Sequence, residues 1–333
     1  MANNIVNNAN VDAEDVWNID STKVLVSGGA GMSGSPSRIY SVTDKNLAWR
    51  DGPKMVYPRY CHSMQRLSNG IALVCGGMPN IADHSNHFRN PKCELFLAEQ
   101  NRFKSLECRL SVPRLKHATA LLPNGNVFVM CGGWDDGTVY RSCEIIDPNI
   151  GCVFSSRAYH TEKVIAGAAC TLDNGSVLFT GGCASVPYEP PECARIVSGA
   201  RLYDYREDKF RYGKTMIYGR SGHTVTAVEN GAIVLGGDFH HSSDNSTTVE
   251  QFDSRTGDFV SLGTTDCEEG ALSSHFAVLV GGGTSGRRSR VLFGGGLLNK
   301  SNNTVRLFDI EDQNVFTVDN SLDNRSYAAA AVI

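Results

Sequence analysis

The stretch "VFVMCGGWDDGTVYRSCEIIDPN" at residues 127–149 decides the fold. It joins a β-prone apolar run, a Gly-Gly pair, a polar segment and a second apolar run that ends in Asp-Pro. Short apolar runs bounded by glycine and polar turn residues are typical of buried strands. The stretch therefore predicts two antiparallel strands, connected by a variable loop that starts at the glycines.

The same pattern occurs six times along the chain. The glycine pairs are Gly28-Gly29, Gly76-Gly77, Gly132-Gly133, Gly181-Gly182, Gly236-Gly237 and Gly294-Gly295. Most pairs follow a hairpin signal such as "SNG", "PNG", "DNG" or "ENG". A third apolar run, a turn and an aromatic residue come after each pair; the aromatic residues are Trp49, Phe103, Phe154, Phe210, Phe259 and Phe316. Each unit thus predicts four short antiparallel strands, here called A to D from the axis outward, which form one propeller blade.

The two ends of the chain predict how the ring closes. The first unit begins at "STKVLVSGG" and lacks a preceding strand, whereas the final segment "NRSYAAAAVI" (324–333) is similar to strand A of other units. We expect this C-terminal strand to complete the N-terminal blade, which leaves no inner edge unpaired. Residues 1–19 are expected to form a loosely ordered N-terminal arm, and residues 20–333 a single propeller domain.

These units resemble the kelch repeat. Its signature is the Gly-Gly pair, Tyr/Phe-Asp in the third strand and an aromatic residue shortly afterwards. The first unit departs from it, because it lacks the Asp after Tyr40. The resemblance covers roughly residues 20–333. It implies an all-β, six-bladed kelch-type β-propeller, closed by the C-terminal strand.

Composition narrows the classes of partner and location. The 333 residues carry a net charge of −4, which disfavours nucleic acid. No apolar run is long enough to span a membrane, and the N-terminus lacks an apolar signal segment. Eleven scattered cysteines, an odd number, suggest free thiols in a reducing compartment. We therefore expect a cytoplasmic protein.

Basic residues at the start of strand A mark a candidate site. Arg59, Arg114, Arg220 and Arg325 open four of the strands, and Lys163 takes this place in the fourth unit. This end of strand A shares a face with the B–C loops and the D–A links. The expected partner-binding residues on that face are Arg59, Tyr60, Arg114, Trp134, Arg220, Asp238, Phe239, Arg325 and Tyr327. Arginine and aromatic residues are enriched at binding hot spots, and the resemblance implies that peptides bind this face.

A structural role for the same arginines remains open. They can instead form ion pairs with the repeated acids Glu94, Glu144 and Glu250. Three histidines follow three of the arginines at a constant spacing: His62, His117 and His223. Their recurrence indicates hydrogen bonds between blades, because a catalytic centre needs unlike groups that converge.

Two loop segments contain residues that can bind metal. One has His84 and His87 near Cys93, and the other has Asp238 with His240 and His241. Neither supplies the four convergent ligands of a structural zinc site. We expect no metal and no other cofactor.

The sequence is compatible with two main functions, besides the possibility of a purely structural subunit in a larger assembly. The first is a non-enzymatic interaction module, a scaffold or adaptor that binds a protein or peptide, and it makes the chain a non-enzyme. The alternative is a carbohydrate-active propeller such as a sialic acid mutarotase-like enzyme. That chemistry needs an acid/base pair and a cation for a carboxylate, for which Arg220, Arg325 and Asp238 are candidates.

Overall fold

The computed structural model describes most of the strand-forming chain. The described residues are 23–30, 37–42, 49–67, 70–79, 92–133, 138–184, 195–238, 247–265, 272–281, 288–296, 304–319, 322 and 325–333. The expected N-terminal arm at residues 1–19 lies outside them.

The described residues form six four-stranded antiparallel sheets. Sheet 1 contains, from the inner strand outward, β29 (Ala329–Val332), β1 (Lys23–Ser27), β2 (Arg38–Ser41) and β3 (Trp49–Asp51). Sheet 2 contains β5 (Ser63–Arg66), β6 (Ile71–Cys75), β8 (Lys92–Leu97) and β9 (Arg102–Arg109). Sheet 3 contains β10 (Ala118–Leu121), β11 (Val127–Met130), β12 (Ser142–Asp147) and β13 (Cys152–Tyr159).

The second half of the chain repeats this order. Sheet 4 contains β15 (Ala168–Thr171), β16 (Val177–Thr180), β19 (Ala200–Asp204) and β20 (Lys209–Tyr212). Sheet 5 contains β21 (Thr224–Val228), β22 (Gly231–Leu235), β23 (Thr247–Asp253) and β24 (Phe259–Thr265). Sheet 6 contains β25 (Phe276–Gly281), β26 (Ser289–Gly294), β27 (Val305–Asp309) and β28 (Asn314–Asp319). Two smaller sheets accompany them: β4 (Arg59–Tyr60) pairs with β7 (Met78–Pro79), and β17 (Cys183–Ala184) pairs with both β14 (Val164–Ile165) and β18 (Arg195–Ile196).

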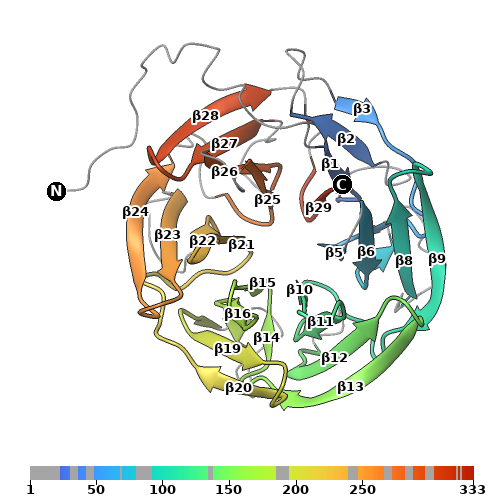
Figure 1. The fold of residues 1–333 in the computed structure, drawn as a ribbon, viewed down its shortest axis with the longest axis horizontal. Helices are drawn as coiled ribbons and strands as arrows, with labels where there is room; N and C mark the ends of the chain where they lie inside the picture. Colours follow the sequence, from blue (N-terminus) through green and yellow to red (C-terminus); the bar gives the residue numbers. More distant parts are fainter. Residues whose placement is uncertain are drawn as a thin grey trace.

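The sheets are arranged around a common axis, with their first strands innermost (Figure 1). Each inner strand contacts the inner strands of two neighbouring sheets, in the cyclic order β29, β5, β10, β15, β21, β25 and back to β29. A separate apolar cluster fills each of the six interfaces between neighbouring sheets. Strand β29 pairs with β1, with Val24 opposite Val332 and Ser27 opposite Ala329. The chain therefore has a β-propeller-like all-β fold.

A closed circle of backbone hydrogen bonds surrounds the axis just before the inner strands. We call its members the axial ring: Cys61, Lys116, Ala166, Gly222, Ser274 and Tyr327. The amide of each member donates to the carbonyl of the preceding one, at 2.7–3.1 Å, and the Cys61 amide donates to Tyr327. One residue from each sheet thus joins a six-membered ring.

All six members of the axial ring have a left-handed backbone, with φ between 50° and 66°. Only Gly222 adopts this conformation without steric cost, and the other five side chains disfavour it. This conformation directs each amide toward the carbonyl of the preceding ring member. The closed ring therefore requires backbone strain at five positions.

The glycine pairs end the second strands and connect neighbouring sheets. The second residue of a pair donates its amide to the carbonyl at the start of the next sheet's inner strand, as in Gly77 to Arg114 and Gly182 to Arg220. A side chain at Gly76 would collide with His117 and the Arg114 carbonyl. The pairs therefore let adjacent backbones approach closely.

Three of the sequence assignments are wrong by one residue. In sheet 3 the left-handed pair is Cys131-Gly132, and in sheet 6 it is Gly295-Gly296. In sheet 4, Val164 rather than Lys163 occupies the position of the arginines, because its carbonyl accepts the Gly132 amide. The triplet sequences "CGG" and "GGG" leave the pair ambiguous, and only the hydrogen-bond register identifies it.

Candidate functional site

The four expected arginines lie inside the protein. The exposed fraction is 0% for Arg59, Arg114 and Arg220, and 1% for Arg325. They do not line the rim as a binding surface, because their guanidinium groups are directed into the sheets to which they belong. The expectation that they contact a partner is corrected by this burial.

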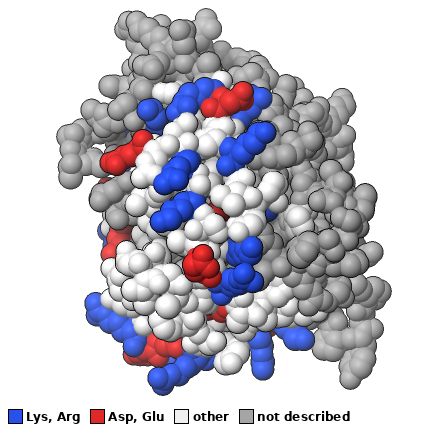
Figure 2. All heavy atoms as spheres, turned by 90° about the vertical axis from the view of Figure 1, so that its right-hand side faces the viewer, with Lys and Arg blue, Asp and Glu red and all other residues white. Residues whose placement is uncertain are grey.

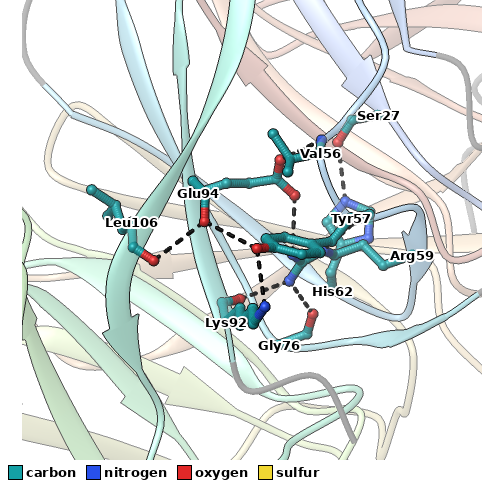
Figure 3. Close-up of polar contacts among 10 residues, drawn as sticks. Ser27, Val56, Tyr57, Arg59, His62, Gly76, Lys92, Glu94 and Leu106 are labelled. Atoms are coloured by element: carbon teal, nitrogen blue, oxygen red, sulfur yellow. Dashed lines mark hydrogen bonds and ion pairs between the residues drawn. The ribbon is translucent and has the colours of Figure 1, made fainter. Parts of the chain in front are cut away.

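Figure 3 shows how Arg59 is held. Its Nη2 pairs with Glu94 Oε1 at 3.0 Å, and its Nη1 donates to the carbonyls of Gly76 at 2.7 Å and Lys92 at 2.9 Å. Glu94 also accepts the amide of Val56 at 2.8 Å, which belongs to the link that enters the sheet. One buried ion pair therefore joins the link, the glycine turn and the third strand.

The same clamp occurs in two further sheets. Arg114 Nε lies 2.9 Å from Glu144, and Arg220 Nη2 lies 2.6 Å from Glu250. Their Nη1 groups donate to the carbonyls of Cys131 and Gly236, the first residues of the left-handed pairs. These three arginines therefore have the structural role that the sequence left open, as partners in buried ion pairs. Arg325 donates to the Gly28 carbonyl at 3.4 Å.

The remaining residues of the expected binding site differ in their environments. Tyr60 is 8% exposed and packs with Cys61 and Leu115. Asp238 is exposed and accepts a hydrogen bond from the Ser273 hydroxyl at 2.8 Å. Tyr327 belongs to the axial ring. Trp134 and Phe239 lie outside the described residues.

The histidines form hydrogen bonds between sheets, as the sequence predicts. His62 pairs with Ser27, His117 with Ser63 and His223 with Thr180, at 2.8–3.0 Å. His275, which the sequence analysis did not single out, pairs with Thr224 at 2.9 Å. Its sequence "SSHF" lacks the arginine that marks the other three histidines, so the signal was weaker.

Burial keeps these histidines neutral. It lowers the pKa of His117 and of His275 to about 3 and holds the pKa of His62 and His223 well below the ordinary value. Nearby guanidinium groups act in the same direction, since Arg59 lies near His62 and Arg220 near His223. The four imidazoles therefore serve as uncharged structural groups at neutral pH.

Lys116 and Tyr327 bring acid/base groups to the axial ring. Lys116 Nζ donates to the Tyr327 hydroxyl at 3.3 Å and lies 4.6 Å from the centre of its ring. The left-handed turns at both residues position these side chains across Cys61, which lies between them in the ring. The thiol of Cys61 is no nucleophile here, because burial raises its pKa to about 12.

A recess of about 150 Å³ lies at this ring, and its lining includes Cys61, Lys116, Ser274 and Tyr327. No carboxylate lines it, so the Lys116 ammonium is its charged group among the described residues. The inner strands enclose a second cavity of about 780 Å³ along the axis. The ring thus offers a small cationic recess beside a larger axial cavity.

Asp238 lies at the same end of the molecule. Its backbone pairs with Ser221, the neighbour of ring member Gly222, and its side chain binds Ser273, the neighbour of ring member Ser274. A carboxylate is therefore fixed between sheets 5 and 6, and Tyr327 follows Ser274 in the ring. Asp238 and Tyr327 were predicted as site residues from the sequence, whereas Lys116 was not, because no motif surrounds it.

Other predictions for this region have mixed outcomes. Cys183 is disulfide-bonded, which corrects the expectation that all thiols are free. The histidines proposed as metal ligands, His84, His87, His240 and His241, lie outside the described residues. Among the described residues there is no group of three potential metal ligands, and no helix has the length and hydrophobicity to cross a membrane.

Comparisons with known proteins support the fold. No family model and no curated protein sequence matches the chain. The solved structure of YjhT is similar to it, with a TM-score of 0.64 and 13% sequence identity, over 83% of this chain and 88% of YjhT. At this identity the likeness concerns the fold.

The expectation of a non-enzymatic scaffold or adaptor is corrected. The arginine surface on which it depended is buried. The likeness to YjhT does not support an interaction module in its place, and at 13% identity it concerns the fold alone. The expectation that the chain is not an enzyme is withdrawn with it, and the alternative of an enzyme is taken up below as a proposal.

Removing one partner of a buried clamp should destabilise the protein strongly. Arg59→Met leaves the Glu94 carboxylate buried without its ion pair, and we expect the free energy of unfolding to fall by about 3–5 kcal/mol. The double variant Arg59→Met/Glu94→Leu should recover much of this loss. Urea unfolding measures both. The exposed pair Arg255–Asp253 is the control, since Arg255→Met should cost less than about 1 kcal/mol. A cost as small for Arg59→Met would contradict the clamp.

Stability should fall on mild acidification. The unfolded state binds protons near the ordinary histidine pKa, whereas the four buried histidines bind them only at much lower pH. Stability is therefore full above about pH 6.5 and is lost as the pH falls toward 3. From pH 6.5 to 5.5 we expect about 1 kcal/mol of loss per histidine, measured by urea unfolding. His117→Gln should reduce the loss over this interval by about 1 kcal/mol. An equal slope in this variant would show that the histidines do not cause it.

Proposed function

We propose that this chain is a six-bladed kelch-type β-propeller, closed by its C-terminal strand, that interconverts the anomers of an acidic sugar of the sialic acid type. The six sheets, the β29–β1 pairing and the closed axial ring support this architecture. The glycine pairs and the Tyr/Phe-Asp and aromatic positions support the kelch type. The eight free cysteines among the described residues suit the proposed cytoplasmic location, whereas the disulfide of Cys183 is uncommon in a reducing compartment.

The observation that carries the proposed activity is the Lys116–Tyr327 contact in the axial recess. Anomer interconversion needs a base to remove the proton from the anomeric hydroxyl and an acid to protonate the ring oxygen as the C–O bond breaks. The open ketone then rotates and closes by the reverse steps. No electrons are exchanged, so the reaction requires only positioned proton donors and acceptors.

The residues at the axial end can divide these roles. Lys116 donates a hydrogen bond to the Tyr327 oxygen, which leaves the phenol proton directed elsewhere and stabilises the phenolate once that proton has moved. Tyr327 is therefore the acid. Asp238 does not line the recess itself. It is exposed beside it, where Ser273 orients one of its oxygens, so the other oxygen can act as the base toward a sugar that extends beyond the recess. The ammonium of Lys116 also attracts the substrate carboxylate, because charge-assisted hydrogen bonds are stronger than neutral ones.

Exchange NMR on N-acetylneuraminic acid tests the proposal. The purified chain should accelerate interconversion of the two anomers, and Tyr327→Phe should slow the catalysed rate by roughly 100-fold. Lys116→Met should raise KM by roughly 10-fold or more through loss of a charge-assisted hydrogen bond. The matched controls are Tyr212→Phe and Lys104→Met, which change exposed residues on outer strands and should act as the wild type does.

A second arm of the experiment examines charge selectivity. Glucose lacks a carboxylate, so the Lys116 ammonium should give it no advantage, and its anomers should interconvert at the uncatalysed rate. If the folded wild-type chain accelerates neither sugar, or if Tyr327→Phe is fully active, the proposed function is wrong.

A further inference from the structure

Two cysteines face each other across the outer strands of sheet 2. Cys93 lies in β8 between Lys92, which pairs with Arg109, and Glu94, which pairs with Ser105. The register shifts between these pairs, so the β-bulge places Cys93 opposite the segment that contains Cys108. Both side chains are buried, at 0% and 5% exposure, and they belong to the same apolar cluster.

The two thiols are in direct contact. A hydrogen bond joins their side chains, and it raises the pKa of Cys93 while it lowers the pKa of Cys108. Cys75 of β6 is the backbone partner of Cys93 on its other side. Cys93 thus has a thiol neighbour on β9 and another cysteine on β6.

Sheet 3 provides a natural comparison for this pair. Its β12 and β13 have the same register shift, with Ser142 opposite Tyr159 and Glu144 opposite Ser155. Cys143 occupies the place of Cys93, but Ala158, 5% exposed, occupies the place of Cys108. The fold therefore accepts alanine at this position, so packing alone does not require the second thiol.

We propose that Cys93 and Cys108 form a reversible modification site, which a peroxide oxidises to a disulfide between β8 and β9. The proposal is independent of the sugar activity. Neither residue is in a disulfide in this structure, which therefore represents the reduced form.

The chemistry requires only the peroxide as co-reactant. The Cys108 sulfur, as thiolate, attacks one peroxide oxygen and breaks the O–O bond, which gives a sulfenic acid and releases water after protonation. The Cys93 sulfur then attacks the Cys108 sulfur, the S–S bond forms, and a second water leaves. Two thiols and one hydrogen peroxide thus give one disulfide and two waters. Cys108 reacts first because its lower pKa favours the thiolate.

The disulfide would lie beside the Arg59 clamp. Cys93 precedes Glu94, which holds Arg59 and the entering link, as Figure 3 shows for Glu94 and Arg59. Exposed and buried residues alternate along the outer strand β9, and Figure 2 shows described Lys and Arg side chains on this side of the molecule. A cross-link here closes a short loop and fixes β9 against the clamp. Oxidation should raise Tm by roughly 5 °C or more.

Peptide mapping tests the proposal on the full chain. The protein is reduced, freed of reductant, treated with hydrogen peroxide and alkylated, then digested with trypsin without reduction. Cys93 and Cys108 fall in separate tryptic peptides, 93–102 and 105–109, so their disulfide links two identifiable fragments. Dithiothreitol should separate them again. Exposed Cys152 reports whether the peroxide acted.

Two variants make the test specific. Cys108→Ala copies sheet 3, so it should fold and should abolish both the linked peptides and the rise in Tm. Ala158→Cys in a Cys152→Ser background recreates the pair in sheet 3, and peptides 142–157 and 158–163 should become linked. The proposal is overturned if Cys93 and Cys108 of the folded protein stay reduced while Cys152 is oxidised. It is overturned equally if Cys93 links to Cys75.

Discussion

The axial ring is the constraint on which the rest of the structure depends. Six amides and six carbonyls, one of each from every sheet, satisfy one another in a closed circle, so no sheet can shift without breaking two hydrogen bonds. The cost is a left-handed backbone at five residues other than glycine. Strained conformations of this kind persist only where the surrounding structure enforces them. Here the glycine turns, the histidine bridges and the apolar clusters between sheets provide that support.

The same ring explains where the candidate site lies. All six ring residues line the recess, and their identities are free to differ because the ring uses backbone groups alone. Ala166 and Gly222 fill little space there, whereas Lys116 and Tyr327 supply an ammonium and a phenol in contact. Asp238 is attached next to the ring through Ser221 and Ser273. The ring positions therefore serve two purposes: their backbone atoms hold the sheets together, and their side chains form the candidate site.

Much of the fold follows from the sequence, and little of the site does. Gly-Gly pairs, Asn-Gly turns and the alanine-rich C-terminal segment predicted repeated four-stranded units and the pairing of the last strand with the first. The arginines were predicted to lie on a binding surface because a repeated charge at a strand end is equally compatible with a surface group and with one half of a buried ion pair. Glu94, Glu144 and Glu250 decide the matter only through their positions in space. Lys116 and Tyr327 are 211 residues apart, and no local motif connects them.

Amide hydrogen exchange, followed by mass spectrometry at peptide resolution, tests the role of the ring most directly. Ring residues lie at the end of a cavity and carry strained backbones, so isolated turns at these places would exchange quickly. If the ring closes the fold, the amides of Cys61, Lys116, Ala166, Gly222, Ser274 and Tyr327 should be among the slowest to exchange and should become labelled together, at the rate of global unfolding. Rapid labelling at Cys61 or Tyr327, while the other members stay protected, would show an open ring and contradict this account.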